Sequence, residues 1–338
     1  MRKVLGLIGL VLVLVVATYV WELSRTGQSN FLTTNNIGNL LTWVGLFGIL
    51  SLGQAFVIVT GGIDLSVGSV VGLVGLLTAD LLGQSGWSPA AALPVCLGLS
   101  ILIGLFHGVL ITKFRLQPFI VTLCGLFLYR GVARLISGDG SRGLEGNVPA
   151  ALTWFGSGYV PGTFIPAPFI ILLLLGAILG AFLHFTGPGR HLFALGANEE
   201  GARFSGIRVH TLKLAAYVIC SLMTGIGAIL LTFKVGSVTP STFGNFYELY
   251  AIAGAVLGGC SLRGGSGSVA GVLIGATLIV LLRNLVNILH IPSQVEYIVI
   301  GGAILVGVIV DELLGERRRK QTRIAPEAQG LETKAAGK

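Results

Sequence analysis

The chain has 338 residues, of which 53% are hydrophobic and only 11% are charged, and its formal net charge is +8 at pH 7. An ordinary soluble domain carries about 25% charged residues, so this composition excludes a water-soluble fold. A bilayer core about 30 Å thick requires about 20 apolar residues per helix, and one such stretch follows another along most of the sequence. We therefore expect an all-α protein, a polytopic transmembrane helical bundle.

About ten spans are predicted, and the ends of each are uncertain by several residues. In chain order they lie near residues 4–21, 40–60, 66–82, 91–111, 118–136, 165–185, 212–232, 247–262, 268–286 and 294–313. The first span follows two basic residues and lacks a small-x-small cleavage site, which favours a retained span over a signal peptide. The segment 247–262 is short, and a re-entrant segment is an open alternative there.

The distribution of lysine and arginine indicates that both termini are cytoplasmic, because these residues collect in cytoplasmic loops. The predicted inner segments contain Arg2, Lys3, Lys113, Arg115, Arg190, Arg203, Arg208, Lys213 and Arg263. The predicted outer segments contain Arg25, Arg142 and Lys234. Arg130, Arg134 and Arg283 fall within or at the ends of spans, where snorkelling or buried pairing must lower their cost. The basic run 317–320 fits the cytoplasmic edge of a membrane better than nucleic acid.

One membrane domain is predicted over residues 1–314. Within it, two connections are longer than the others, an outer one near 137–165 that is rich in Gly and Pro, and a charged cytoplasmic loop at 186–213. Each is a candidate docking surface. Residues 315–338 are charged and contain few large apolar side chains, so a disordered cytoplasmic tail is expected there.

An acid and two hydroxyls stand among glycines between the second and third spans, in a segment that we call the first break (residues 61–69). It reads Gly61-Gly62-Ile63-Asp64-Leu65-Ser66-Val67-Gly68-Ser69. Paired glycines interrupt a helix, and the freed backbone groups are tolerated in a membrane only where protein or a water-filled path satisfies them. Asp64 is therefore a functional candidate. The structural alternative, that Asp64 or Ser66 caps the third span, is equally open, and both can hold together.

A related pattern occurs later in the chain, in what we call the second break (residues 258–269). Its glycines and serines resemble those of the first break, and both breaks fall on the cytoplasmic side of the predicted topology. A degenerate internal repeat and a chance similarity of helix-breaking sequences both remain possible explanations. The helical spacing of Gly267, Gly271 and Gly275 predicts close packing against another helix.

The cytoplasmic stretch 189–207 is predicted to form a short amphipathic helix that ends at Gly206. Asn198 is a plausible N-cap, with acidic residues in the turn that follows it. Such a helix lies either on the lipid surface or in a groove of a partner subunit. The partner is the interpretation that we favour.

Motifs for chemistry on the chain itself are missing from the sequence. No G-x-x-x-x-G-K-[ST] phosphate loop occurs, so ATP cannot be bound by that route. Neither H-E-x-x-H nor G-x-S-x-G occurs, so we expect no catalytic residue, no metal and no enzyme activity. Single histidines are interpreted as ordinary polar or interfacial residues, and they are His107, His184, His191, His210 and His290. The cysteines are interpreted as buried packing residues, and they are Cys96, Cys124, Cys220 and Cys260.

The first break resembles the signature of the permease subunits of bacterial ABC sugar importers, the ribose, xylose and galactose type of the binding-protein-dependent transport permease family. The resemblance extends to Phe31-Leu32-Thr33 with Asn36, to 189–207, to Tyr247-Glu248-Leu249, to Leu257-Gly258-Gly259 and to Gly264-Gly265. It therefore covers nearly the whole chain. Relatives that import branched-chain amino acids share the fold without being expected to carry this string. A departure occurs at Asn245 and Phe246, where smaller residues are expected.

The resemblance implies a multi-pass protein of the bacterial inner membrane that forms a monosaccharide path as a homo- or heterodimer. Implied partners are ATP-binding cassette ATPase subunits, which bind the ATP, a periplasmic sugar-binding protein that meets the outer loop, and membrane lipid, with no nucleic acid and no cofactor. Residues of the path would be Gly61, Gly62, Asp64, Ser66, Gly68 and Ser69. Residues that couple to the ATPase would be Arg190, Asn198, Glu199, Glu200, Arg203, Ser205 and Gly206. Further path or packing residues would be Asn36, Glu248, Gly258 and Gly259.

Asp64 is expected to shape the turn near the cytoplasmic side of the path and not to recognise sugar directly. The main alternative function is a self-sufficient secondary transporter, in which Asp64, Glu248 or Glu296 carries protons or holds a cation. Uptake driven by an ion gradient without an ATPase would distinguish it. Which sugar is carried is not encoded in these patterns.

Overall fold

The computed structural model describes residues 2–27, 29–144, 148–289, 291 and 292, and the positions 295, 298, 301, 302, 305 and 309. The tail at 315–338, Glu296 and most of the predicted span 294–313 lie outside the described residues. Among those that are described, eight helices are long and apolar enough to cross a membrane. The prediction of an all-α membrane bundle is confirmed, whereas the total of ten spans and the cytoplasmic location of both termini stay predictions.

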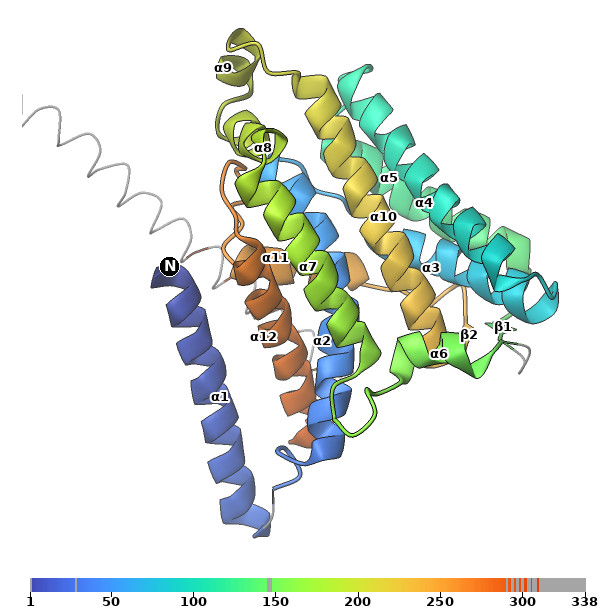
Figure 1. The fold of residues 1–338 in the computed structure, drawn as a ribbon, viewed down its shortest axis with the longest axis vertical. Helices are drawn as coiled ribbons and strands as arrows, with labels where there is room; N and C mark the ends of the chain where they lie inside the picture. The colour runs from blue at the N-terminus through green and yellow to red at the C-terminus, as the bar shows by residue number, and fades with distance from the viewer. Residues whose placement is uncertain are drawn as a thin grey trace, which may run out of the picture.

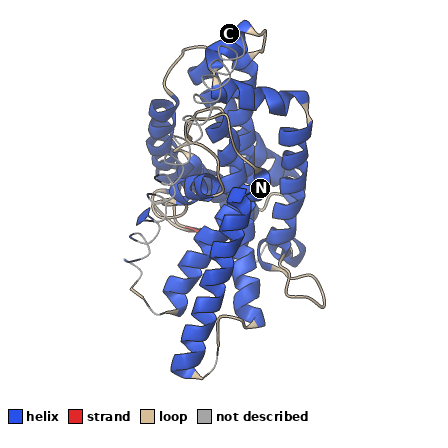
Figure 2. Cartoon of the chain, turned by 90° about the vertical axis from the view of Figure 1, so that its left-hand side faces the viewer, coloured by secondary structure: helices blue, strands red, loops and turns tan. Residues whose placement is uncertain are grey.

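Most of the described chain is helical (Figure 2). The elements are α1 (Arg2–Thr26), α2 (Thr34–Val59), α3 (Val67–Ala79), the π-helix η1 (Asp80–Gln84), α4 (Pro89–Thr112), α5 (Pro118–Ser137), β1 (Arg142–Gly143), α6 (Ala150–Ser157), α7 (Ala167–Phe185), α8 (Gly187–Ala197), α9 (Glu199–Phe204), α10 (Val209–Val235), β2 (Ser237–Val238), α11 (Tyr247–Leu257) and α12 (Val269–Ile288). One end of the molecule carries α8 and α9, and the other carries α6 and the small sheet (Figure 1). The two strands are antiparallel, with Arg142 opposite Val238.

The long helices begin and end where the sequence dictates. Pro89 and Pro118 are the first residues of α4 and α5, positions where the missing N–H of proline costs nothing. Gly138 and Gly236 follow α5 and α10 in the left-handed conformation, which glycine adopts without a steric penalty. At 1.5 Å per residue, the 26 residues of α2 extend about 39 Å, which is enough to cross the apolar core of a bilayer.

Helix α2 is the centre of the bundle. It contacts α7, α10, α11 and α12, and 94% of the residues in its most apolar 18-residue stretch are buried. Three glycines on its surface allow this crowding: a Cβ atom at Gly45 would overlap the backbone of Pro168, one at Gly48 would meet the Leu172 side chain, and one at Gly53 would lie 3.0 Å from the carbonyl oxygen of Cys220. Small residues at the contacts of membrane helices permit this close backbone approach.

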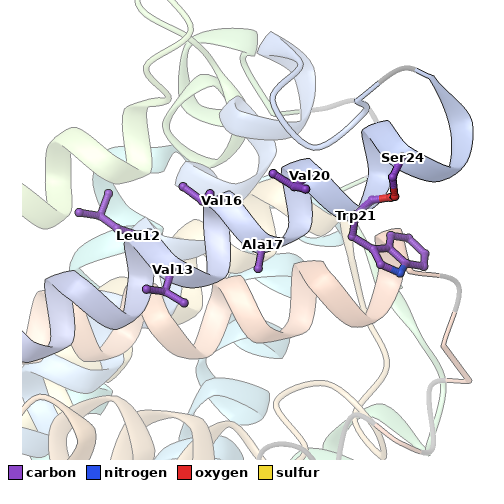
Figure 3. Close-up of a pocket in the computed structure, with 7 residues that line it drawn as sticks. All are labelled: Leu12, Val13, Val16, Ala17, Val20, Trp21 and Ser24. Atoms are coloured by element: carbon purple, nitrogen blue, oxygen red, sulfur yellow. The ribbon is translucent and has the colours of Figure 1, made fainter.

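Helix α1 is peripheral to the bundle and packs mainly on α12. Apolar side chains of its middle turns lie against Leu281 and Leu285, whereas its remaining surface is largely exposed. A groove of about 690 Å³ along that surface is lined by Leu12, Val13, Val16, Ala17, Val20, Trp21 and Ser24 (Figure 3). An apolar surface of this kind is stable against the hydrocarbon chains of lipids. Nothing in the groove offers the charged or amide groups that would orient a polar ligand.

The chain crosses the bundle twice by a non-helical stretch followed by a helix. The first crossing follows α2 and continues into α3, and the second runs from β2 through residues 239–246 into α11. The 11 residues of α11 extend only about 16 Å, half of the bilayer core. Its end is joined to the far end of α2, because the Gly265 N–H donates to the Val59 carbonyl at 2.9 Å. The segment 247–262 thus contains a short helix and a loop that is bonded to the end of α2, and the full span and the re-entrant segment both stay predictions.

The cysteine prediction is correct for three residues and wrong for one. Cys96, Cys220 and Cys260 are buried, whereas Cys124 is exposed on the outward side of α5.

The two long connections also contain structure that hydropathy does not reveal. The connection 137–165, which is predicted to be outer, includes the short helix α6, whose Gly156 lies directly against the backbone of α10 near Lys234.

Candidate functional site

The first break starts with a hydrogen-bonded helix end. Gly61 adopts a left-handed conformation with φ of +80°, its N–H donates to Ile58, and the N–H of Gly62 donates to the Val57 carbonyl at 3.1 Å. This pair of bonds is the Schellman arrangement, which satisfies carbonyl groups that the end of a helix leaves open. Residues 63–66 then run without helical bonds until α3 begins at Val67.

Asp64 is buried in this turn, with 1% of its surface exposed. Its Oδ1 accepts hydrogen bonds from the Ser66 N–H at 2.8 Å and from the Ser66 hydroxyl at 2.6 Å. The side-chain amide of Gln54 donates to the Asp64 carbonyl at 3.3 Å and accepts from the Asp64 N–H at 3.1 Å. Ser66 occupies the N-cap position of α3 but makes no capping bond with its side chain. These bonds to Ser66 hold the shape of the turn, and a role of Asp64 at a translocation path stays a prediction.

A histidine and two tyrosines from three helices surround the free side of this carboxylate. His107 of α4 has its Nδ1 3.8 Å from Asp64 Oδ2, beyond hydrogen-bond length, and its Nε2 is 2.8 Å from the Tyr129 hydroxyl of α5. Tyr217 of α10 meets the His107 ring edge-on, with centroids 6.4 Å apart. All four side chains are buried. We call Asp64, Ser66, His107, Tyr129 and Tyr217 the buried polar cluster.

The interpretation of His107 as an ordinary polar or interfacial residue is wrong, because its side chain is 0% exposed and belongs to the buried polar cluster. The signal was present in the sequence: His107 lies inside a predicted span, at 91–111. An ionisable residue in the middle of a membrane helix faces the protein interior and needs a polar partner. Tyr129 and Tyr217 carry no comparable signal, since tyrosine is also common at membrane interfaces.

Replacing Tyr129 by phenylalanine is expected to lower the free energy of unfolding by about 1 kcal/mol, because His107 Nε2 loses a buried hydrogen-bond partner. The ring is kept, so packing stays intact. Thermal denaturation of the purified variant in detergent measures the change. Tyr159→Phe is the control, since this residue is 39% exposed and water can replace any contact of its hydroxyl. Equal stability of the Tyr129 variant and the unaltered protein would contradict this role of the hydroxyl.

The two crossings, each a non-helical stretch followed by a helix, meet near the starts of α3 and α11. Arg130 of α5 donates to the carbonyls of Pro240 at 2.8 Å and Phe243 at 2.6 Å, and it approaches the Gly68 carbonyl at 3.5 Å. Glu248, in the first turn of α11, is 8% exposed, and a Cβ atom at Gly68 would overlap its carboxylate. A negative group beside the first turn of a helix is favoured by the helix dipole. Arg130 and Glu248 thus join the non-helical stretch 239–246 to α3.

Arg134 and Arg283, the other two arginines of predicted spans, also have partners that lower the free-energy cost of a charge in the membrane. Arg134 makes an exposed ion pair with Asp139, with Nε 2.7 Å from Oδ1. The guanidinium of Arg283 lies over the rings of Phe47 and Tyr250, at 5.2 and 4.8 Å from their centroids. A cation over an aromatic face is stabilised by the ring quadrupole, more so away from water.

Two of the three spaced glycines, Gly271 and Gly275 of α12, pack closely against α11 and its end, as their spacing predicts. A Cβ atom at Gly271 would overlap the Gly258 carbonyl, and one at Gly275 would overlap that of Gly254. Gly267 precedes the helix and lies against the Cys260 side chain instead. Gly259 is left-handed, with φ of +93°, and follows the end of α11. Gly258 and Gly259 therefore serve packing and helix termination.

The loop 189–207 forms two helices, α8 and α9, where the sequence predicted one. Asn198 separates them and is the N-cap of α9, because its Oδ1 accepts from the Gly201 N–H at 2.9 Å. Glu199 pairs with Lys213 of α10 at 2.6 Å. The turn ends at Gly206 with φ of +80°, which agrees with the predicted end. The remaining predicted coupling residues are on the exposed surface of this region, and they are Arg190, Glu200, Arg203 and Ser205.

Phe204 was not singled out by the sequence, yet it is the most exposed apolar side chain of this loop, at 83%. The Arg203 guanidinium lies 5.7 Å from the centre of its ring. Aromatic side chains are enriched at protein–protein interfaces, so Phe204 is a candidate for such a contact.

Asn36 lies at the opposite end of the molecule from α8 and away from both breaks. Its amide exchanges two hydrogen bonds with Asn284 of α12, at 2.8 and 3.2 Å, and also donates to the Phe31 carbonyl. It joins α2 to α12. Of the two predicted roles, path or packing, these contacts support packing.

The arrangement as a whole offers fixed backbone geometry and few reactive groups. Among the residues that the structure describes, no three His, Cys, Asp or Glu side chains gather where a metal ion could bind. Asp64 of the first break is held by Ser66, Arg130 of α5 donates to backbone carbonyls, and Glu248 of α11 lies against Gly68. Such an arrangement can define a passage through a membrane and change its shape when the helices shift.

The sequence matches known proteins along most of its length. The family described as branched-chain amino acid transport system / permease component matches residues 36–308. The ribose import permease protein RbsC of Escherichia coli is 38% identical over 85% of this chain and 88% of that protein. RbsC of Bacillus subtilis is 40% identical over 83% of this chain and 86% of its own. The xylose transport system permease protein XylH of Escherichia coli is 31% identical over 86% and 88%, respectively. No solved structure matches the chain.

Proposed function

The chain belongs to the family described as branched-chain amino acid transport system / permease component, and on this premise we propose that it is the membrane permease subunit of a monosaccharide importer. The observation that carries the sugar assignment is the similarity to permeases named for ribose and xylose, at 31–40% identity over more than four fifths of the chain. The buried polar cluster adds support, because it is built on the Asp64 and Ser66 of the signature string.

Energy for transport comes from other chains in this proposal. The sequence has no phosphate-binding loop, so two ATP-binding cassette ATPase subunits would bind and hydrolyse the ATP. A periplasmic sugar-binding protein would deliver the substrate to the outer end, where α6 and the β1–β2 sheet lie. A second permease copy would complete the path in the bacterial inner membrane. Residues 186–213, which we call the coupling segment, would dock on the ATPase.

Reconstitution tests the function. The permease, the ATPase and the binding protein encoded beside it are placed in proteoliposomes, and uptake of radiolabelled ribose, xylose and galactose is measured. We expect uptake of at least one of these sugars that requires both ATP and the binding protein. Uptake by the permease alone under a proton or sodium gradient would instead support a secondary transporter. The buried state of Asp64, which is bonded to Ser66, argues against a proton-carrying role for it.

Phe204→Ala is expected to weaken binding of the ATPase subunit at least tenfold, because an exposed aromatic anchor loses its contact area. Affinity for the ATPase is measured on the permease in nanodiscs. Phe185→Ala is the matched control: it is also 83% exposed, but it lies at the end of α7, outside α9. Equal weakening by both variants would indicate a general surface effect and contradict the assignment of α9.

A further inference from the structure

The last turn of α8 touches the end of α2 and the second break through its backbone. The Gly265 N–H of the second break donates to the Val59 carbonyl, the last residue of α2. Gly196 of α8 lies against this bond, so close that a Cβ atom there would overlap the Val59 oxygen and the Gly265 nitrogen. Figure 1 shows α8 at the same end of the molecule as the upper end of α2. Only glycine fits at position 196 without displacing one of the two segments.

Three more glycines complete this contact. A Cβ atom at Gly264 would lie 2.8 Å from the Gly196 carbonyl oxygen and 2.8 Å from the Gly61 nitrogen. One at Gly265 would lie 2.7 Å from the Cα atom of Ala197. Gly61, Gly264 and Gly265 also have positive φ angles, between +73° and +83°. We call Gly61, Gly196, Gly264 and Gly265 the glycine junction.

The contacts of the glycine junction are made by backbone atoms. A displacement of one segment therefore passes to the others and is not absorbed by the rotation of side chains. Close-packed interiors are barely compressible, and here no rotatable group separates α8 from the end of α2 or from the second break. The same turn of α8 is held by Leu195, which is 1% exposed and packs with Ala202 and Val209. The first break leads from Gly61 to Asp64 in three residues. A shift of α8 must therefore move the turn that the buried polar cluster holds.

Space for such a shift exists beside the junction. A cavity of about 340 Å³ is bordered by Gly61 and Gly196 of the glycine junction, by the Glu199–Lys213 ion pair and by Tyr217. The Tyr217 hydroxyl is aimed at the first break, since a Cβ atom at Gly62 would lie 2.6 Å from it. The cavity is large enough to hold several water molecules. The glycine junction is thus closely packed where α8 meets the other two segments, whereas its remaining side faces the cavity.

We infer that Gly196 is the positioning residue through which the coupling segment moves both breaks as one body. This inference rests on the proposed function, because it assumes that an ATPase displaces the coupling segment. The glycine junction is the mechanical link, and α8, the end of α2 and the second break keep a fixed separation through the transport cycle.

Gly196→Ala in the complete importer tests the link. In proteoliposomes we expect sugar uptake to fall at least tenfold while the ATPase subunits still bind and hydrolyse ATP, so that the number of sugars per ATP falls equally. Gly98→Ala is the matched control, because it makes the same change inside a helix, α4, that lies outside the coupling segment, at a position with nothing within 4 Å. Its uptake should stay within twofold of the unaltered importer. An unchanged ratio of sugars to ATP in the Gly196 variant would overturn the inference.

A distance measurement does not depend on the folding of that variant. Spin labels at Ala194→Cys and Ser266→Cys, both exposed positions, report the separation of α8 and the second break in a background without other cysteines. We expect the same distance with and without bound ATP, and a changed distance would overturn the inference. Absence of ATP-dependent uptake by the unaltered importer would refute the proposed function, while a constant distance in that protein would still support a rigid junction.

Discussion

Replacing Asp64 by alanine will lower the free energy of unfolding by about 3–5 kcal/mol, the range for removing one member of a buried charged interaction. The substitution leaves the Ser66 N–H and hydroxyl without their acceptor in a site that water does not reach. It also removes the acidic neighbour of His107. Denaturation of the purified protein in detergent measures the loss, and sugar uptake should fall with it.

Asp139→Ala is the control for this change, because it removes an aspartate of the same charge from the surface. Asp139 is 52% exposed, and a hydrogen bond from Arg134 lowers the pKa of its carboxyl group. We expect a much smaller loss of stability there, since water replaces the lost contacts. Similar losses at both positions would show that Asp64 is not held as the structure describes.

Asp64→Asn separates shape from recognition, because it keeps the size of the side chain and one acceptor oxygen. We expect lower stability and lower uptake of every sugar, with the order of preference among sugars unchanged. An altered preference with normal assembly and normal use of ATP would place Asp64 in direct contact with substrate.

Arg130→Met will destabilise the protein by about 2–4 kcal/mol, because the carbonyls of Pro240 and Phe243 lose their charged donor, and each unsatisfied group costs about 1–3 kcal/mol. Methionine keeps most of the side-chain volume, so the loss reports hydrogen bonding. Detergent denaturation and sugar uptake measure the effect. Arg130→Lys should recover part of both, since an ammonium group also donates, though without the planar geometry of arginine.

Arg134→Met is the matched control, one helical turn further along α5. Its guanidinium is 52% exposed and binds the exposed Asp139, so water can replace the contact. A loss at Arg134 as large as that at Arg130 would mean that helix α5, and not the 239–246 stretch, is what the Arg130 substitution disturbs.

Hydropathy predicted most membrane helices to within a few residues. The predicted span 118–136 is the helix Pro118–Ser137, and 165–185 is Ala167–Phe185, because proline marks both starts and the apolar stretch ends where polar residues begin. The small sheet could not be predicted. Its pairing of Arg142 with Val238 joins segments almost a hundred residues apart, and a two-residue strand has no periodic pattern.

The two breaks were predictable for a different reason: paired glycines and a left-handed turn leave a local signal. What surrounds Asp64 leaves none. Gln54, His107 and Tyr217 come from three helices, and whether each faces inward depends on helix rotation and packing, which one sequence with few polar markers does not determine. The division of the inner loop into α8 and α9 follows from Asn198, whose extended backbone ends one helix and starts the next. Asn198 was predicted as an N-cap, but the end of the preceding helix at the same residue was not predicted.

The central position of α2 has a consequence for synthesis of the protein. Helix α2 is made second, yet the helices that enclose it, α7, α10, α11 and α12, are made later. Until they arrive, polar groups such as Ser51 and Gln54, both 0% exposed in the finished fold, must face lipid or an insertion factor. The 11-residue α11 cannot cross the bilayer alone and must enter beside α2 and α12. The centre of the molecule is thus among the first parts made and the last to be enclosed, so a stalled nascent chain would expose the very surface on which the finished fold depends.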